Sequence, residues 1–436
     1  QVTVNRVNSL YERDMALRFN LVANNDLIIF IESDEFSNNN SRSLINESQT
    51  VIDNYILFDN YDIGHTVSTG GGGLAQLYSP CSVNKARGIT GSSSPINDPY
   101  DIDYVSHEIG HQFGATHSYN NSCDGNRSSS SAYETGSGNT IMAYAGICAP
   151  NVQSYSDDHF HNYSIVQMSA FVASSGNCSV NRAITNTPPT ISTIPSYTIP
   201  YGTPFKLTAN ATDAQNDALT YVWEQMDREI TTQPPVATAT SGPNFKSVRP
   251  SSSPTRYFPA FSSVLDGNLS PTWEVLPSVA RPLNFAVTVR DNNTAGAQTR
   301  IQNANVTVAN TGPFRITSPV ADNTIWDVNS QQTITWNVAG TTANGINVSS
   351  VNILLSLDEG ETFTTIAAGT PNDGTEVVNI PNTPSTNARI LIEANGNIFY
   401  TVSKRIVIGY NISQQEVCKD YTLNYNNLVL NQAAIY

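Results

Sequence analysis

The sequence is short of charge, and what charge it has is mostly of one sign. Only 13% of its 436 residues are charged, and 36 acidic residues outnumber 21 lysines and arginines, which gives a net charge of −15. An acidic surface of this kind argues against binding to nucleic acid or to an anionic membrane. No apolar run approaches the ~20 residues that a membrane-spanning helix needs. The composition therefore predicts a globular protein that has no nucleic-acid partner and no membrane span.

Cysteine is also scarce, and no two cysteines form a CxxC pair, which argues against a zinc site made of thiolates. The five lie at Cys81, Cys123, Cys148, Cys178 and Cys418. Four of them fall within the first 178 residues, an even number that is compatible with two disulfides and an oxidising compartment. Asn, Ser and Thr are abundant and no signal peptide begins at residue 1, so we expect a processed, secreted chain.

The pattern of the chain changes near residue 185, and its length predicts two or three domains. Helical periodicity is present in residues 4–11, 44–56, 103–113 and 164–171. Residues 15–21 alternate with period two, and the apolar run at 27–31 is typical of a buried strand. Residues 1–184 are thus predicted to form a mixed α+β domain.

Beyond a proline-containing linker at 185–190, the chain has the pattern of short strands separated by turn residues. Alternating apolar residues divide it into blocks at 191–310 and 311–409, and Asp358–Gly360 is predicted to be a hairpin turn. Each block has the size of an immunoglobulin-like or fibronectin-like sandwich. The fold class is therefore an α+β domain followed by two all-β sandwiches, with 410–436 as a tail or the start of another module.

One motif dominates the first domain, the segment HEIGHQFGATH at residues 107–117. His107 and His111 are four residues apart, so on a helix both imidazoles project from one face and reach one ion. Gly114 can end the helix in the left-handed conformation, and the turn brings back His117 as a third ligand. Three neutral imidazoles suit Zn²⁺ and leave a fourth position for water, as in a catalytic site.

The chemistry that this arrangement supports is hydrolysis of a peptide bond without a covalent intermediate. Zinc lowers the pKa of its bound water from ~15.7 towards ~7 and polarises the carbonyl. Glu108 would take the proton of the attacking water and pass it to the leaving amine. The alternative is a helix that carries surface histidines. Met142, 25 residues beyond His117, could form an apolar floor under the metal, although a lone methionine is more often a core filler.

With Met142, the motif resembles the metzincin metalloendopeptidases, whose pattern is HExxHxxGxxH followed by a methionine turn. Within that group, residues 4–183 are most similar to the bacterial reprolysin-like (adamalysin/ADAM-related) proteases. The resemblance implies a metzincin fold for 1–184, zinc on His107, His111 and His117, and Glu108 as general base. It also implies that Met142 lies beneath the metal.

Two residues depart from the reprolysin pattern, because Ser118 stands where an aspartate is usual and Tyr144 follows Met142 by two. In astacins and serralysins the tyrosine at that position binds zinc at rest and stabilises the oxyanion. Tyr144 is thus either an oxyanion donor or a plain core tyrosine.

The resemblance also bears on the cysteines and on substrate binding. Of the three pairings that four cysteines allow, it favours Cys123 with Cys148, across the methionine turn, and Cys81 with Cys178. The extended segment that contains Leu74, Ala75, Gln76 and Leu77 matches the metzincin edge strand that binds substrate backbone. An ordinary interior strand is the alternative.

Two weaker signals remain outside the motif. The turns Asp213–Asn216–Asp217 and Asp291–Asn293 are rich in oxygen and could each bind Ca²⁺, though β-turn chemistry also explains them. His65, His159 and His161 are not in ligand spacing with the motif, and we expect the last two in a solvated loop.

We therefore predict a secreted zinc endopeptidase, a hydrolase that acts on proteins or peptides and has catalytic Zn²⁺ and structural Ca²⁺ as candidate cofactors. Its β modules, which resemble the Ig-like and cadherin-like modules of secreted bacterial enzymes, would bind a surface or matrix ligand or act as spacers. One rival hypothesis is a catalytically silent adhesin that uses these modules. A second rival is a zinc hydrolase that is not a protease, which the third histidine and Met142 disfavour.

Overall fold

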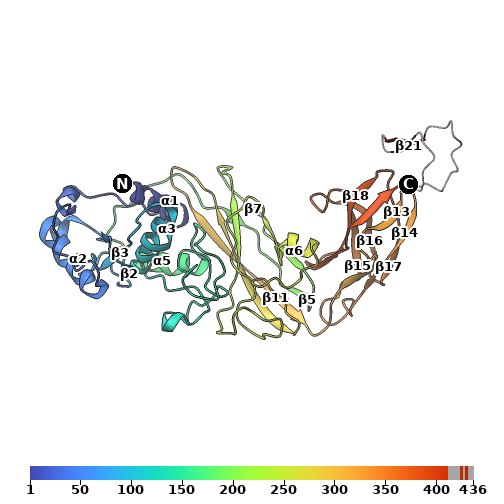
Figure 1. The fold of residues 1–436 in the computed structure, drawn as a ribbon, viewed down its shortest axis with the longest axis horizontal. Helices are drawn as coiled ribbons and strands as arrows, with labels where there is room; N and C mark the ends of the chain where they lie inside the picture. The colour runs from blue at the N-terminus through green and yellow to red at the C-terminus, as the bar shows by residue number, and fades with distance from the viewer. Residues whose placement is uncertain (411–422, 426–427, 431–436) are drawn as a thin grey trace.

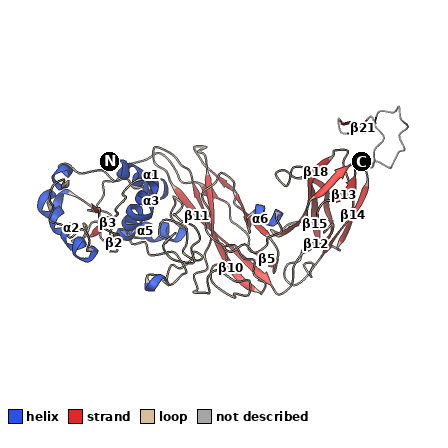
Figure 2. Ribbon diagram, viewed as in Figure 1, coloured by secondary structure: helices blue, strands red, loops and turns tan. Residues whose placement is uncertain are grey.

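The computed structural model describes residues 1–410, 423–425 and 428–430, and Cys418 lies outside these described residues. The molecule is elongated, with the helical region at one end and β structure in the middle and at the other end (Figure 1). Figure 2 shows that helices are concentrated in the N-terminal part and strands in the rest. The expected order, an α+β region followed by all-β structure, is confirmed.

The N-terminal region is built from helices around one small sheet. Its helices are α1 (Val2–Met15), α2 (Ser41–Ile56), α3 (Asn97–Tyr100), the π-helical η3 (Asp101–Ser106), α4 (His107–Gln112) and α5 (Asn162–Ser174), with short 3₁₀ turns η1 (Asn25–Ile28), η2 (Phe58–Asn60) and η4 (Cys123–Gly125). Its strands are β1 (Thr66–Ser68), β2 (Gly72–Ala75) and β3 (Gly88–Gly91). They pair in the order β1-β3-β2, with β1 parallel and β2 antiparallel to β3. All four helices expected from periodicity are present, so the period of the apolar residues is a sound guide here.

The core of this region lies between α1, α4 and α5. Tyr11 packs edge-on against Phe160, with ring centroids 5.1 Å apart, and donates a hydrogen bond to the carbonyl of Ser106 at 2.9 Å. Phe113 and Met142 belong to the same buried cluster. The helix that carries the histidine motif is therefore held on its inner side by aromatic packing.

The strand expected at residues 27–31 is absent, and residues 15–21 form no strand either. The run instead passes through η1, and Ile29 and Ile31 are 61% and 90% exposed. Phe30 packs edge-on against Tyr55 of α2, with ring centroids 5.7 Å apart, and Ile28 joins a small cluster with Ile52. The prediction was wrong because the run packs mainly against α2, so Ile28 and Phe30 are only partly buried and the residues on either side of Phe30 are exposed.

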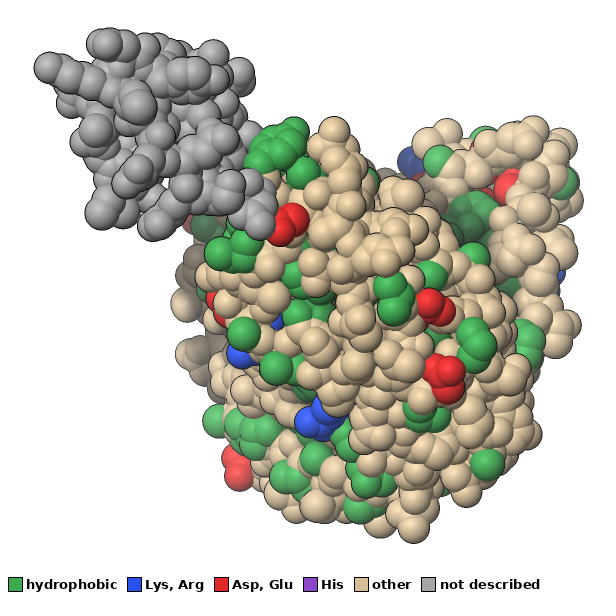
Figure 3. All heavy atoms as spheres, turned by 90° about the vertical axis from the view of Figure 1, so that its right-hand side faces the viewer, with side chains coloured by type: hydrophobic (Ala, Val, Ile, Leu, Met, Phe, Trp, Pro, Cys, Tyr) green, Lys and Arg blue, Asp and Glu red, His purple; other side chains and the backbone are tan. Residues whose placement is uncertain are grey.

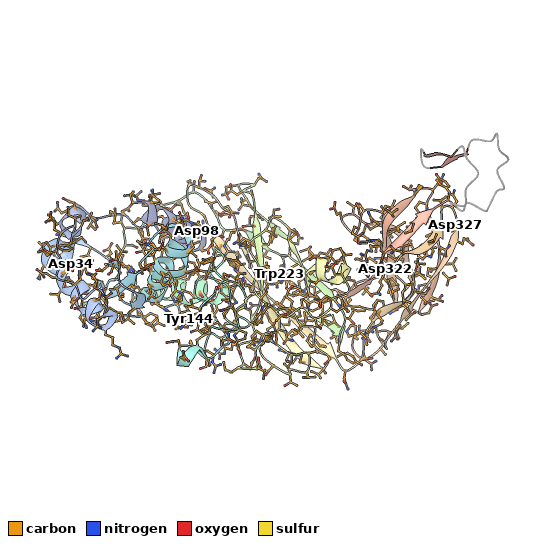
Figure 4. All side chains as sticks on the ribbon, in the orientation of Figure 1. Asp34, Asp98, Tyr144, Trp223, Asp322 and Asp327 are labelled. Carbon is orange, nitrogen blue, oxygen red and sulfur yellow. A yellow bond between two sulfur atoms is a disulfide. The ribbon has the colours of Figure 1, made fainter. Side chains whose placement is uncertain are left out.

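The middle of the molecule is a set of antiparallel pairs around a four-stranded sheet in the order β5-β11-β10-β8. Its elements are β4 (Thr190–Ile191), β5 (Tyr197–Pro200), β6 (Phe205–Thr208), β7 (Ala211–Thr212), β8 (Thr220–Gln225), β9 (Thr255–Phe258), α6 (Phe261–Leu265), β10 (Arg281–Arg290) and β11 (Thr299–Ala309). Trp223 on β8 is almost fully buried and lies in the centre of this block (Figure 4). β8 from Tyr221 and β10 from Phe285 are buried on both faces, because one face packs in the β core and the other contacts the helical region.

The far end contains two further sheets, in the orders β12-β14-β17 and β13-β20-β18-β15-β16, with β19 also paired to β18. The strands are β12 (Arg315–Ser318), β13 (Thr324–Asp327), β14 (Gln331–Asn337), β15 (Ser350–Ser356), β16 (Thr364–Pro371), β17 (Thr375–Asn379), β18 (Ser385–Ala394), β19 (Tyr400–Val402) and β20 (Ile406–Gly409), followed by β21 (Leu423–Tyr425) and β22 (Leu428–Leu430). The turn predicted at Asp358–Gly360 lies between the antiparallel strands β15 and β16. Seen end-on, this end presents mostly uncharged surface with scattered charged side chains (Figure 3).

The two β blocks share one continuous hydrophobic core. Lys206 N donates to Ile398 O at 3.0 Å, and Tyr400 N donates to Pro204 O at 2.9 Å. Tyr257 of β9 packs edge-on against Tyr400 of β19, with ring centroids 5.5 Å apart. The junction between the blocks is thus packed and hydrogen-bonded, as an interior is.

Candidate metal centre

Three histidines converge beside α4, which continues directly from the π-helical η3. His107 and His111 lie one turn apart on α4, and His117 returns from the loop after Gly114, whose φ of +91° is the left-handed conformation expected at a helix end. The ligand nitrogens of all three lie within 4.8 Å of one another. The spacing of the motif thus places all three imidazoles at one point.

Backbone carbonyls orient each imidazole. The Nδ1 atoms of His107, His111 and His117 lie 2.7, 2.7 and 2.5 Å from the carbonyl oxygens of Ile141, Ala115 and Asn126. A carbonyl only accepts, so each Nδ1 carries the proton and each Nε2 keeps a lone pair. This is the outer-shell arrangement that holds histidine ligands around a metal.

The unpaired nitrogens show that the site fits a cation. Nε2 of His107 is buried and has no hydrogen-bond partner, and the Nε2 atoms of His111 and His117 face each other at 3.1 Å. Burial lowers the pKa of all three imidazoles, to about 3 for His111, and the neighbouring histidines lower those of His107 and His111 further. Three neutral nitrogen donors that face one point are a donor set suited to Zn²⁺.

Glu108 is the acidic group beside these nitrogens. Its carboxylate is buried, its Oε2 has no partner, and burial raises the pKa of the carboxyl to about 8. A Cβ at Gly73 of β2 would overlap this carboxylate, so the glycine lets the strand pass close to it. A nearby divalent cation would favour the ionised form of Glu108 and offset the effect of burial.

Met142 packs against the histidine helix at Gly110. Its side chain is fully buried, and its sulfur lies so close to Gly110 that a Cβ there would overlap it. Ser118 N donates to the carbonyl of Met142 at 3.1 Å, which ties the turn to the residue after the third histidine. The methionine turn and the helix are therefore packed as one unit.

Aromatic rings form one wall of the centre. The ring centroid of Tyr144 lies 4.5 Å from that of His117, Tyr119 stacks on His117 at 5.2 Å, and the two tyrosine rings lie 4.8 Å apart. Burial, followed by the charge of Glu108, raises the pKa of Tyr144 to about 12, so its hydroxyl keeps its proton at neutral pH. Figure 4 shows that Tyr144 belongs to the N-terminal region. The sequence did not predict Tyr119 as a site residue, because the fold of the loop is what brings its ring to His117.

A buried carboxylate that the motif does not contain fixes the methionine turn. Glu134 accepts hydrogen bonds from Ser118 Oγ at 2.5 Å, from Asn139 N at 2.7 Å and from Thr140 N at 3.0 Å. Ser118, the departure from the usual aspartate, is thus a donor to an acidic group that comes from elsewhere in the chain. The sequence did not mark Glu134 as part of the site, because it lies 16 residues after Ser118 and belongs to no motif.

The segment expected to bind substrate lies beside the helix. β2 contains Leu74 and Ala75, pairs antiparallel with β3 only, and so forms one edge of the sheet. Gln76 N continues the pairing to Arg87 O at 2.9 Å, and Leu77 is exposed. The strand therefore has one free edge beside Glu108.

Both expected disulfides are present, Cys81–Cys178 and Cys123–Cys148. The second joins the loop after His117 to the segment after Tyr144, on either side of the methionine turn. The first ties the region before the zinc helix to the segment that follows α5.

The histidines outside the motif are not in a solvated loop, and that prediction was wrong. His159 and His161 are 0% and 1% exposed, and their Nε2 atoms lie 3.7 and 3.9 Å from a carboxylate oxygen of Glu224 on β8. They were misassigned because their partner comes from the β block, 63 or more residues away. His65 is also internal, hydrogen-bonded to Gln112 and Thr90 at 2.8 and 2.9 Å.

The helical region and the first β block form a polar, buried junction. Arg290 of β10 binds Asp14 of α1 at 2.6 Å, and both side chains are fully buried. Asn120, in the loop after the third histidine, donates to Glu229 O at 3.1 Å and accepts from Thr231 N at 3.1 Å. The β block thus contacts the loop that carries His117.

Comparison with known proteins agrees with this geometry. Residues 1–118 match the family model described as metallo-peptidase family M12B, reprolysin-like. The match ends one residue after His117, so the reprolysin-like region contains all three histidines and Glu108. The N-terminal region therefore resembles a metallopeptidase family over residues 1–118, and its three histidines form a group that could hold a metal ion.

Several solved structures resemble the β part of the chain. They include the I67–I69 fragment of titin (13% identity, 51% of this chain and 66% of that chain, TM-score 0.17) and the FN1–FN3 domains of chicken CNTN1 (10%, 51% and 65%, TM-score 0.17). A third is the four-domain immunoglobulin segment of Sidekick-1 (14%, 52% and 49%, TM-score 0.16). The chain spans about two thirds or less of each, and its β architecture rests on the strand pairing described above. No curated protein matches the chain.

None of the described helices is long and apolar enough to span a membrane.

Proposed function

We propose that the protein is a secreted zinc endopeptidase that hydrolyses peptide bonds in protein substrates. The observation that carries the proposal is the set of three neutral imidazoles, each oriented by a carbonyl, with the unpartnered carboxylate of Glu108 beside them. The match of residues 1–118 to a metallopeptidase family supports the same reaction.

His107, His111 and His117 would hold the metal through Nε2. A bound Zn²⁺ would supply Lewis-acid activation of a water molecule and of the scissile carbonyl. Glu108 would accept the proton of the attacking water and transfer it to the leaving amine. Tyr144, protonated at neutral pH and beside His117, would donate a hydrogen bond to the developing oxyanion.

The substrate would lie along β2 in an extended conformation. The strand is short, has a free edge, and passes Glu108 at Gly73, so main-chain hydrogen bonds would place the scissile bond over the carboxylate. In this proposal Leu74, Ala75, Gln76 and Leu77 are the substrate-binding residues, and Leu77, which is exposed, would contact a substrate side chain.

The remaining parts have supporting roles in this proposal. Two disulfides and the low charge content favour an extracellular location. The β blocks, residues 191–310 and 311–409 after a linker at 185–190, would bind a surface or matrix ligand, while 1–184 forms the protease domain.

The test is cleavage of a denatured protein by the full chain and by its Glu108→Ala variant, with zinc content measured for both. We expect the variant to keep about one zinc and to lose 10²–10⁴-fold in kcat, the contribution of a general base. Zinc binding without cleavage by the wild-type chain would contradict the protease assignment and favour a silent adhesin. Equal cleavage by the variant would remove Glu108 from the mechanism.

A further inference from the structure

Two oxygen-rich turns that are far apart in the sequence meet at one end of the first β block. Asp213 and Asp217 lie between β7 and β8, and Asp291 directly follows β10. Antiparallel pairing sets Thr220, the first residue of β8, opposite Arg290, the last residue of β10. The turns are therefore neighbours at the same edge, and carboxylate oxygens of the three aspartates lie within 4.8 Å of one another.

The segment before β4 adds a fourth side chain to this group. Asn186 is only 8% exposed, and its Nδ2 donates to Asp291 Oδ2 at 2.6 Å and to Gly296 O at 2.9 Å. Its amide is thus directed at the aspartates, yet its Oδ1 is buried and has no partner. Asp213 Oδ2 is in the same condition. Two buried acceptors without donors are costly in a folded protein and indicate a missing positive partner.

No side chain of the described residues supplies that partner. The ion pairs among them involve other carboxylates, such as Asp157 with Arg249, and none involves the three aspartates. Asp291 itself is only 1% exposed, so solvent screens its charge poorly. Each carboxylate accepts hydrogen bonds from neutral donors, but three carboxylates this close still repel one another, and a cation between them would offset that repulsion.

We propose that Asp213, Asp217, Asp291 and the Oδ1 of Asn186 bind one calcium ion. All four donors are oxygens, which selects a hard cation over zinc. Calcium accepts six to eight oxygens in irregular geometry, so carboxylates, an amide and water complete its shell, whereas magnesium demands a near-ideal octahedron.

The ion would fasten the connection between the protease region and the β blocks. Residues 181–189 form no regular structure, and Asn186 and Pro189 are buried among them. Gln298 Nε2 donates to Asn186 O at 2.6 Å, which holds the same residue to the start of β11. With calcium bound, three separate segments of the chain share one ion, and the connection is held in place.

Calcium binding is measured on the full chain after chelating resin has removed divalent ions and one equivalent of zinc has been restored. Titration calorimetry with CaCl₂ should show one saturable site, with a Kd of roughly 10⁻⁴–10⁻³ M, as is usual for extracellular modules. Arg182, exposed four residues before Asn186, provides a second readout. Trypsin cleavage after Arg182 should be at least ten times slower in saturating calcium, because the segment must open to be cut.

Matched variants locate the ion. The double variant Asp213→Asn, Asp217→Asn and the single variant Asn186→Ala should each weaken calcium binding at least tenfold, with zinc content and far-UV circular dichroism unchanged. Asp266→Asn, an exposed aspartate elsewhere in the block, should bind calcium as the wild type does. No saturable heat up to about 10 mM calcium, or binding by both site variants equal to that of the wild type, would overturn the proposal.

Discussion

The described residues contain two clusters of three potential ligands, and they are built in opposite ways. The histidine cluster comes from eleven consecutive residues on one helix and its exit, and its members are neutral. The aspartate cluster comes from turns 74 or more residues apart, and strand pairing between β8 and β10 brings it together. A local cluster can be recognised in the sequence as a motif, whereas a non-local one is visible only as two unrelated turns.

The clusters also differ in what they require of a cation. Neutral imidazoles are tolerated in the interior, so the histidine site can stay formed when no metal is bound. Three adjacent carboxylates repel, so the aspartate site should depend on its ion for its shape. Asp14 is a buried carboxylate that needs no metal ion. Arg13 and Arg290 bind it at 2.7 and 2.6 Å, so the protein itself supplies the positive charge.

The largest expected effect is that a variant of either cluster loses its own metal and keeps the other. His111→Ala removes one of the three proposed zinc ligands and the partner of His117 Nε2, so we expect zinc content to fall from one equivalent to near zero. Calcium binding by the same variant should be unchanged. The double variant Asp213→Asn, Asp217→Asn should show the reverse pattern. Atomic absorption for zinc and calorimetry for calcium measure both.

A Gln298→Ala variant controls for indirect effects, because it loses a contact to the main chain of Asn186 without removing a ligand. It should keep both metals. If His111→Ala lowers calcium affinity, the two clusters are coupled and the comparison between independent sites fails.

Asp14 sharpens the comparison from the side of a carboxylate that already has its cation. Asp14→Asn leaves Arg290 buried without a charged partner, and we expect a loss of 3–5 kcal/mol in the free energy of unfolding. Asp98→Asn is the matched control, since that carboxylate is 57% exposed and pairs with Arg6 at the surface. It should cost no more than about 1 kcal/mol. Urea unfolding of both variants gives the values, and equal losses would contradict a buried, structural role for the Asp14 pair.

The same distinction between local and distant partners explains what could be predicted. The helices and the histidine centre depend on spacings of three and four residues, and they follow from the sequence. The apolar run at 27–31 satisfied the pattern of a buried strand, but whether a second apolar layer covers it depends on packing that no local pattern encodes. His159 and His161 follow two aspartates and resemble a surface loop, yet Glu224 of the β block buries them.

A second consequence concerns the residues around the histidines. Tyr144 could be marked because its position relative to Met142 is constant in a known motif, whereas Glu134 and Tyr119 carry no such mark. Both act through contacts made by an irregular loop, Glu134 on three donors and Tyr119 on the ring of His117. Irregular loops are therefore where sequence reasoning about a site loses information first.

A moderate effect is expected at the aromatic wall, which has no counterpart in the aspartate cluster. Tyr144→Phe keeps the ring beside His117 and removes only the hydroxyl, so kcat should fall about a hundredfold, as for one oxyanion donor. KM and zinc content should change little, because the hydroxyl would act in the transition state. Tyr119→Phe is the control and should retain most activity. A rise in KM with unchanged kcat would assign Tyr144 to substrate binding instead.

The smallest expected effect is on the pH dependence of the free energy of unfolding. It should differ between wild type, in which arginines bind the Asp14 carboxylate, and Asp14→Asn, in which an amide replaces it. Burial alone would raise the pKa of Asp14, but the charges and hydrogen bonds of Arg13 and Arg290 outweigh it and hold that pKa well below the usual 3.8. Because the folded pKa is depressed, the carboxyl contributes stability above pH 3.8, and this contribution is lost as pH falls towards the folded value. Between pH 7 and pH 3 one such group loses about 1 kcal/mol. The free energy of unfolding of wild type should therefore fall by about 1 kcal/mol more than that of Asp14→Asn over this range, with the other carboxylates common to both. An equal fall in the two chains would mean that Asp14 titrates normally and that the arginines do not hold its charge.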